Sequence, residues 1–248
     1  MRRGHFIELE GDGAHETTLL PPAVVAPNPC ADASGIFGAV CVGFSQNPVK
    51  GFELEDMRIE GFLNGAFLVN TEGAEVDHMV FANNEVYGAF YNSSTGGNYH
   101  DNIAYGSAGD ASRWTLDDNT VVHNDMACPA GDEGPAVSGI GIALSGATKV
   151  NVDDNTVNDN VPSGPTIASG GIVLVSTIDE GGTPASDNRI TDNHLDGNRP
   201  FDISDDGAGT GNRFDDNRCE TSSPAGLCGH DNGHHDNQTD SGNHDSRV

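Results

Sequence analysis

The segment VNVDDNTVNDN (150–160) decides the fold, because its pattern returns five more times along the chain. Each copy has a short β-branched run, then Asp-Asn or Asn-Asn, then another apolar residue, and the other copies are VFANNEVYG (80–88), NYHDNIAYG (98–106), WTLDDNTVVHN (114–124), NRITDNHLDGN (188–198) and NRFDDNRC (212–219). A second strand follows Gly or Pro between them, in GAFLVN (65–70), GAFYN (88–92), GIGIAL (139–144), GGIVLV (170–175) and PFDIS (200–204). Two short strands alternating in a fixed order are typical of a solenoid.

This alternation predicts an all-β protein, a single-domain right-handed parallel β-helix of roughly six to eight coils with about 4.8 Å between coils. Inward residues such as Ile142 and Leu144 would be buried against the coils above and below. The recurrent asparagines are expected to stack at equivalent turns, where their amides bond the next coil and satisfy turn backbone groups. These asparagines are Asn84, Asn102, Asn119, Asn155, Asn193 and Asn217.

The domain prediction is a β-helix over residues 1–228 and a polar tail over residues 229–248. The tail, GHDNGHHDNQTDSGNHDSRV, has no apolar residue before its last position and is expected to be disordered. Its histidines alternate with aspartates and could chelate transition metals, although a purely solubilising tail is the other interpretation. The Pro- and Gly-rich stretches 126–139 and 161–170 are expected to be loops on one face, where a binding site could form.

The charge of the chain excludes several partners. Its formal charge is −27, from 38 acidic and 11 basic residues, which argues against nucleic acid and against an anionic membrane surface. No stretch is long and apolar enough for membrane insertion. An acidic secreted protein and a protein adapted to high salt both fit this composition.

The five cysteines form no CxxC pair of the kind that binds zinc. Cys30 with Cys41, and Cys219 with Cys228, are close enough in sequence to close small disulfide loops, which leaves Cys128 unpaired. Disulfides form outside the cytosol, so the sequence predicts an extracellular or secreted protein, with no apolar signal region in this chain.

Three segments resemble secreted bacterial proteins with right-handed parallel β-helix repeats, which are common in actinomycetes and related to pectate-lyase-like folds. They are GDEGPAVSGIGIALSGA (131–147), VPSGPTIASGGIVLV (161–175) and GAGTGNRFDDNRCETSSPAGLC (207–228), with a weaker likeness from 5 to 106. The resemblance implies the fold but no catalytic residue. It also implies that coils are missing between AYGSAG (104–109) and SRWTLDDN (112–119), and a cysteine partner lost with them would explain Cys128.

For function, the favoured interpretation is an extracellular module that presents a rigid surface to a glycan, the cell wall or a protein partner. No GxSxG, HExxH, P-loop or dinucleotide fingerprint is present. His78, His100, His123 and His194 lie at different offsets from their nearest recurrent asparagine, so no row of imidazoles is expected across the coils. The oligomeric state is not predicted.

The alternative is a cation-dependent polysaccharide lyase or a glycoside hydrolase. A lyase needs a cation such as Ca²⁺ and a base. Candidate metal ligands are Asp117, Asp118, Asp153 and Asp154, and candidate bases are Arg113 and Arg189. The paired carboxylates of a hydrolase could come from Asp202, Asp205 and Asp206. The competing interpretation of the Asp-Asp pairs is that they are solvated turn residues.

Overall fold

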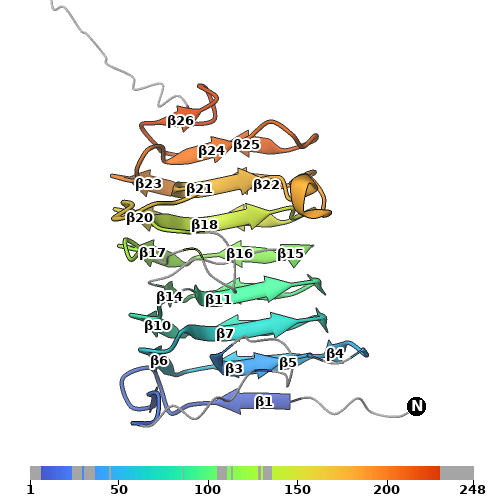
Figure 1. Ribbon diagram of the computed structural model, residues 1–248, viewed down its shortest axis with the longest axis vertical. Coiled ribbons are helices and arrows are strands. Elements are labelled where there is room, and N and C mark those ends of the chain that lie inside the picture. Colours follow the sequence, from blue (N-terminus) through green and yellow to red (C-terminus); the bar gives the residue numbers. More distant parts are fainter. Residues whose placement is uncertain are drawn as a thin grey trace, which may run out of the picture.

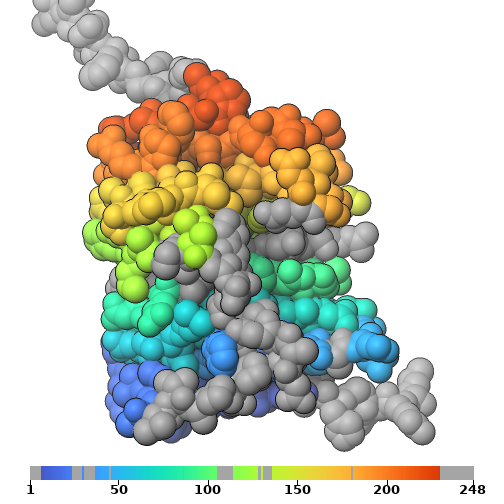
Figure 2. All heavy atoms as spheres, in the orientation of Figure 1, coloured from blue at the N-terminus to red at the C-terminus, as the bar shows by residue number. Residues whose placement is uncertain are grey.

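The computed structural model describes residues 7–23, 30, 37–44, 46–85, 87–104, 111–112, 114–127, 130 and 136–229. In these residues the chain forms a right-handed parallel β-helix, as predicted, with every strand pairing parallel (Figure 1). The space-filling view shows the coils as flat layers stacked from the blue to the red end (Figure 2). The predictions for Arg113, Cys128 and residues 230–248 lie outside the described part, and the domain boundary before residue 229 stays a prediction.

Two faces of the solenoid are continuous sheets, which we call face 1 and face 2. Face 1 has eight strands, one per coil, so the described chain makes eight coils: β1 (Ile7–Glu10), β5 (Phe52–Glu55), β9 (Glu75–Asp77), β13 (Asn98–His100), β16 (Thr115–Asp117), β19 (Asn151–Asp153), β22 (Arg189–Thr191) and β25 (Arg213–Asp215). Face 2 has seven strands: β2 (Thr18–Leu19), β6 (Arg58–Glu60), β10 (Val80–Ala82), β14 (Ile103–Ala104), β17 (Thr120–Val122), β20 (Thr156–Asn158) and β23 (His194–Asp196).

The third face carries the Gly-led strands and is divided into two sheets. One contains β3 (Gly38–Val42), β7 (Asn64–Val69) and β11 (Tyr87–Asn92), and the other contains β18 (Ile140–Ser145), β21 (Gly170–Val175), β24 (Ile203–Asp205) and β26 (Ser222–Ser223). A short sheet follows this face, with β4 (Val49–Lys50), β8 (Thr71–Glu72), β12 (Ser94–Thr95) and β15 (Ala111–Ser112). One 3₁₀ turn, η1 (Ile178–Glu180), lies outside the sheets.

The core is a narrow column of apolar side chains between the faces. The central residue of each face 1 strand points inward, as Leu54, Val76 and Val152 do with no exposed surface. Ile142 and Leu144 are buried in the same core, as predicted. Each fully buried aliphatic side chain stabilises the fold by about 1.5–3 kcal/mol, but only when a neighbouring coil covers it.

An asparagine ladder follows the turn between face 1 and face 2. In each step the backbone N–H and the side-chain amide of one asparagine donate to the Oδ1 of the asparagine in the next coil, as Asn119 does to Asn155 at 3.0 and 2.8 Å. The ladder consists of Asn102, Asn119, Asn155, Asn193 and Asn217, each 1% exposed. The predicted stacking is therefore confirmed for five of the six asparagines.

The sixth, Asn84, is a correction, because it lies at the turn between face 2 and the third face. Its Oδ1 accepts from the backbone N–H of Phe62, and its Nδ2 donates to the Ile59 carbonyl. A second ladder occupies this turn further along, formed by Asn124, Asn160 and Asn198. Both turns place a left-handed residue before the asparagine, so the sequence pattern is the same at each.

The short fourth coil does not interrupt faces 1 and 2, although coils were expected to be missing near it. Tyr99 pairs with Leu116 on face 1, and Ile103 pairs with Thr120 on face 2, so the solenoid closes directly across this junction. The described parts of the two long loops contact each other, with Ser163 donating from its N–H to the Ser138 hydroxyl.

Both predicted disulfides are confirmed. Cys30–Cys41 and Cys219–Cys228 have Cα–Cα distances of 5.4 and 5.3 Å, and the second closes the loop that ends the last coil. No helix among the described residues is long and apolar enough to cross a membrane.

Candidate metal centre

The outer surface of face 1 carries two columns of polar residues, because the residues on either side of each inward apolar residue point outward. The strand registers define them. The first column is Glu8, Glu53, Glu75, Asn98, Thr115, Asn151, Arg189 and Arg213. The second column is Glu10, Glu55, Asp77, His100, Asp117, Asp153, Thr191 and Asp215.

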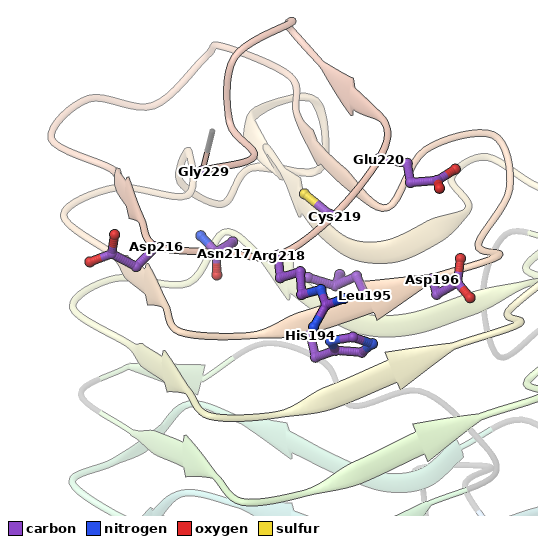
Figure 3. A pocket seen from close by; sticks show the side chains of 9 residues that line it. All are labelled: His194, Leu195, Asp196, Asp216, Asn217, Arg218, Cys219, Glu220 and Gly229. Carbon is purple, nitrogen blue, oxygen red and sulfur yellow. The ribbon is translucent and has the colours of Figure 1, made fainter. Parts of the chain in front are cut away.

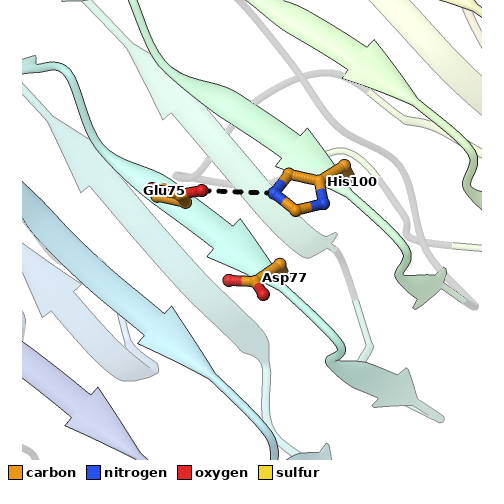
Figure 4. A group of neighbouring side chains, drawn as sticks. All are labelled: Glu75, Asp77 and His100. Carbon is orange, nitrogen blue, oxygen red and sulfur yellow. Dashed lines mark hydrogen bonds and ion pairs between the residues drawn. The ribbon is translucent and has the colours of Figure 1, made fainter.

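Glu75, Asp77 and His100 come together in the middle of this surface. One ligand atom from each lies within 4.8 Å of the other two (Figure 4). Asp77 and His100 are directly opposite each other on β9 and β13, and His100 Nε2 lies 3.3 Å from Glu75 Oε1. The group is partly buried, and it combines one imidazole nitrogen with two carboxylates, a donor set that suits transition metals.

Two further contacts orient this group. His100 Nδ1 donates to Asp101 at 3.0 Å, which leaves Nε2 directed toward the two carboxylates. His78 Nδ1 donates to the Asp77 carboxylate at 2.7 Å. A carboxylate on the far nitrogen of a histidine commonly fixes that histidine as a metal ligand.

Both imidazoles are held toward their charged form. The hydrogen bond to Asp77 raises the pKa of His78 above its ordinary value. For His100, burial opposes the charge, but the hydrogen bonds to Asp101 and Glu75 outweigh it, so its pKa is also raised. The pKa of the Glu55 carboxyl is raised as well, first by burial and then by the nearby carboxylates of Asp77 and Glu10.

We expect the melting temperature to fall as the pH rises from about 5 to about 8. For His78 and His100, the raised pKa means that the folded chain holds its proton more tightly than the unfolded chain. This stabilisation is complete below the ordinary histidine pKa and is lost as the pH rises through the folded value. The raised pKa of Glu55 also makes stability fall as the pH rises, but at lower pH than for the two histidines. Thermal melts followed by circular dichroism across this range, at constant ionic strength, measure the effect, and a rising melting temperature would contradict it.

The four aspartates predicted as metal ligands lie on the same surface, one or more coils further along. Asp117 and Asp153 are adjacent in the second column, and Asp118 and Asp154 occupy the turn that follows. Burial and nearby aspartates, Asp153 first, raise the pKa of Asp154. Among the described residues, no three of these ligand atoms gather within 4.8 Å, unlike Glu75, Asp77 and His100. Their role in binding metal stays a prediction.

The three predicted hydrolase carboxylates accept hydrogen bonds from the chain itself. Asp202 is 2% exposed, and its two oxygens accept from Asn198 and from the backbone of Glu220 and Thr221. Asp205 accepts from the Gly207 N–H and from the Asn212 side chain. Asp206 accepts from the N–H groups of Ser176 and Ala208. These bonds end ladders and close turns, so the three carboxylates have structural partners.

Arg189 is exposed in the first column, opposite Arg213 on the next coil. No ion pair joins it to an acidic residue of the described chain. The other predicted base, Arg113, lies outside the described residues. Among the described residues, neither Asp117 nor Asp153 forms an ion pair with an arginine.

A pocket of about 510 Å³ opens at the last coil and not beneath the two long loops. It lies beside β23, which is joined to the last coil by a single β-bridge between His194 and Arg218. The side chains of these two residues project into the pocket, and Asp196 and Glu220 lie at its side (Figure 3). These four residues are exposed, so the pocket is an open, mixed-charge hollow. It does not contain the converging acids and bases of a buried active site.

Sequence reasoning missed Glu75, Asp77 and His100 as a group. The asparagine nearest to His78 gives a misleading offset, because in the third coil it is Asn84, which belongs to the other turn. The inward residues carry the usable signal, because aligning Val76 with Tyr99 places Asp77 opposite His100.

Comparisons with known proteins agree with this architecture. A family model described as periplasmic copper-binding protein (NosD) matches residues 38–226. A mutant of DFA-IIIase from Arthrobacter chlorophenolicus A6 in complex with DFA-III is 15% identical over 88% of this chain and 48% of that chain, with a TM-score of 0.53. Another structure of a DFA-IIIase mutant from the same organism is 15% identical over 68% of this chain and 37% of that chain, with a TM-score of 0.50.

A third solved structure, the A-module of the mannuronan C-5 epimerase AlgE4 from Azotobacter vinelandii, is 14% identical over 70% of this chain and 61% of that chain, with a TM-score of 0.33. The chain spans less than half the length of the two DFA-IIIase structures, and at these identities the likeness concerns the fold. No curated protein matches the chain.

Proposed function

The chain belongs to the NosD family of right-handed β-helix proteins, and from this we propose that it binds a copper ion outside the cytosol through Glu75, Asp77 and His100. The observation that carries the proposal is the approach of the three ligand atoms within 4.8 Å on the outer face of one sheet. The formal charge of −27 supports it, because a strongly acidic surface concentrates cations.

The donor set favours a transition metal over the Ca²⁺ that the lyase interpretation considers. Calcium takes about six to eight oxygen ligands, whereas imidazole with carboxylates suits copper or zinc. Among divalent first-row ions, copper generally binds a given nitrogen and oxygen site most tightly. The family description and the chemistry of the three side chains therefore point to the same ion.

The two disulfides support a location in the periplasm or beyond it, because such bonds persist in oxidising compartments. We propose binding and not catalysis, because Asp202, Asp205 and Asp206 would have to give up their backbone hydrogen bonds to act on a substrate. Lyase or hydrolase activity on a polysaccharide is thus the less favoured alternative.

Glycan binding is a second candidate, favoured by the middle of the first column. Asn98, Thr115 and Asn151 form an uncharged polar row on a flat sheet, and such groups hydrogen-bond to sugar hydroxyls. Calorimetric titration with neutral and uronate oligosaccharides tests it, and an absence of heat with both would exclude this candidate.

We expect His100→Asp to weaken Cu²⁺ binding by roughly 100-fold. Aspartate stands at the next two positions of the second column, Asp117 and Asp153, so the exchange suits the strand while removing the only imidazole among the three ligands. Titration of Cu²⁺ followed by calorimetry measures the affinity in a background in which the tail histidines His230, His234, His235 and His244 are asparagine.

The matched control is His123→Asp. His123 has the same left-handed backbone as Asp159 on the next coil, but it lies at the turn between face 2 and the third face, away from the proposed centre. We expect it to bind Cu²⁺ like the parent chain. Equal affinity of the His100 variant and the parent would refute the proposed centre.

A further inference from the structure

The turn after face 1 repeats one residue type with a single exception. Its first residue has a left-handed backbone, with φ between 51° and 55° in each of the coils from β5 to β25. Aspartate holds this position at Asp56, Asp101, Asp118, Asp154, Asp192 and Asp216, whereas the coil of β9 has His78. Aspartate tolerates this backbone through its short polar side chain, and a histidine is not needed to make the turn.

The second column departs from its own pattern at the neighbouring coil. His100 is its only imidazole and stands between Asp77 and Asp117. The two exceptions therefore occur on adjacent coils of an otherwise carboxylate-rich surface, His78 in the turn and His100 in the second column. Neither substitution is required by packing, since aspartate fills both positions elsewhere in the solenoid.

His78 lies beside the proposed copper centre, outside the group of three ligand atoms. The ring centroids of His78 and His100 are 6.4 Å apart, with an interplanar angle of 76°. Asp77 connects them, because it accepts a hydrogen bond from His78 and shares the three-residue group with His100. The His78 side chain is 57% exposed, so it can turn about its side-chain bonds without disturbing the core.

We propose that His78 is the fourth ligand of this centre, which makes the donor set two imidazoles and two carboxylates. This inference rests on the proposed copper binding and explains how the centre would select Cu²⁺ over other cations. Four nitrogen and oxygen donors suit the tetragonal coordination that Cu²⁺ prefers, whereas a second nitrogen gives no advantage to Ca²⁺ or Mg²⁺. The pair of histidines therefore sets copper apart from the hard cations that an all-carboxylate surface would collect.

Asp101 has a supporting role in this arrangement. By accepting from His100 Nδ1 at 3.0 Å, it holds Nε2 toward Glu75 and Asp77. It occupies in its own coil the turn position that His78 occupies in the coil of β9. The same turn thus supplies a ligand in one coil and a positioning carboxylate in the next.

The test is His78→Asp, which introduces the residue found at this position in the other six coils from β5 to β25 and so preserves the turn. Pulsed electron paramagnetic resonance counts the imidazole nitrogens coupled to Cu²⁺. With less than one equivalent of Cu²⁺ and the tail histidines replaced by asparagine, we expect two coupled imidazoles in the parent. We expect one in His78→Asp, with affinity lowered by roughly 10-fold.

His123→Asp, with the same exchange at a left-handed position, should keep both imidazoles and the parent affinity. Circular dichroism and thermal melts confirm that the variants are folded. If His78→Asp keeps two coupled imidazoles at unchanged affinity, the fourth-ligand proposal is overturned while the copper centre stands. If His100→Asp leaves the parent spectrum unchanged, the centre itself is overturned. Unchanged or tighter binding of Ca²⁺ in His78→Asp supports the selectivity, because aspartate adds an oxygen ligand, and a matching loss of Ca²⁺ binding opposes it.

Discussion

Replacing Asn155 with alanine is expected to lower the free energy of unfolding by roughly 3–6 kcal/mol. Asn155 is 1% exposed, and its Oδ1 accepts from both the backbone N–H and the side chain of Asn119. Its Nδ2 donates to the Leu116 carbonyl and to Asn193. Alanine leaves these buried groups without partners, and each costs about 1–3 kcal/mol.

Equilibrium unfolding in urea measures the loss, with Asn158→Ala as the control. Asn158 is in the same coil, but its Oδ1 makes one exposed hydrogen bond, accepted from the Asp196 N–H. We expect that control to cost at most about 1 kcal/mol. Equal losses in the two variants would show that the ladder does not stabilise the solenoid more than a surface contact does.

The sequence alone was sufficient for the fold because the repeat appears in residue types that have one physical use. A β-branched run followed by Asp-Asn specifies a strand that ends in a left-handed turn, as at Asp154 and Asn155. The sequence was not sufficient to assign each asparagine to the correct turn of its coil. Asn84 and Asn102 follow strands of different faces, and the same dipeptide pattern serves both.

The candidate centre was harder to predict, because it depends on which residues of different coils lie opposite each other. The coil of β9 has Met79 where the next coil has Asn102, and the Met79 N–H donates to the Asn102 side chain. Because no asparagine follows His78 in its turn, the position of His78 in the repeat cannot be counted from the recurrent asparagines. The distance from Asp77 to His100 in sequence also depends on the length of the intervening loop, which differs from coil to coil.

The Asp-Asp pairs and the aspartates near residue 202 show a different difficulty. A carboxylate in a turn and a carboxylate in an active site have the same sequence signature. Only the partners distinguish them, and for Asp202 the partners are Asn198, Glu220 and Thr221 of its own chain. Its position four residues after the Asn198 of a Gly-Asn turn gives no sign of those contacts.

Asp202 ends the second asparagine ladder, in the way that a further asparagine would. Its Oδ1 accepts from the Asn198 side chain at 2.9 Å and backbone at 3.3 Å, as Asn198 itself accepts from Asn160. Its Oδ2 accepts from the N–H groups of Glu220 and Thr221 at 3.1 Å and from the Thr221 hydroxyl at 3.0 Å. The carboxylate therefore ties the seventh coil to the disulfide-closed loop above it.

For this reason we expect Asp202→Ala to lower the free energy of unfolding by roughly 3–5 kcal/mol, because two buried donors of Asn198 and three part-buried donors of Glu220 and Thr221 lose their acceptor. Urea unfolding measures the total, and hydrogen exchange should show the amides of Glu220 and Thr221 losing protection first. Asp196→Ala, an exposed aspartate of the same coil, should change stability by no more than about 0.5 kcal/mol. An Asp202 variant with parent stability would mean that this carboxylate is free to serve another purpose, and the hydrolase interpretation would then regain its strongest residue.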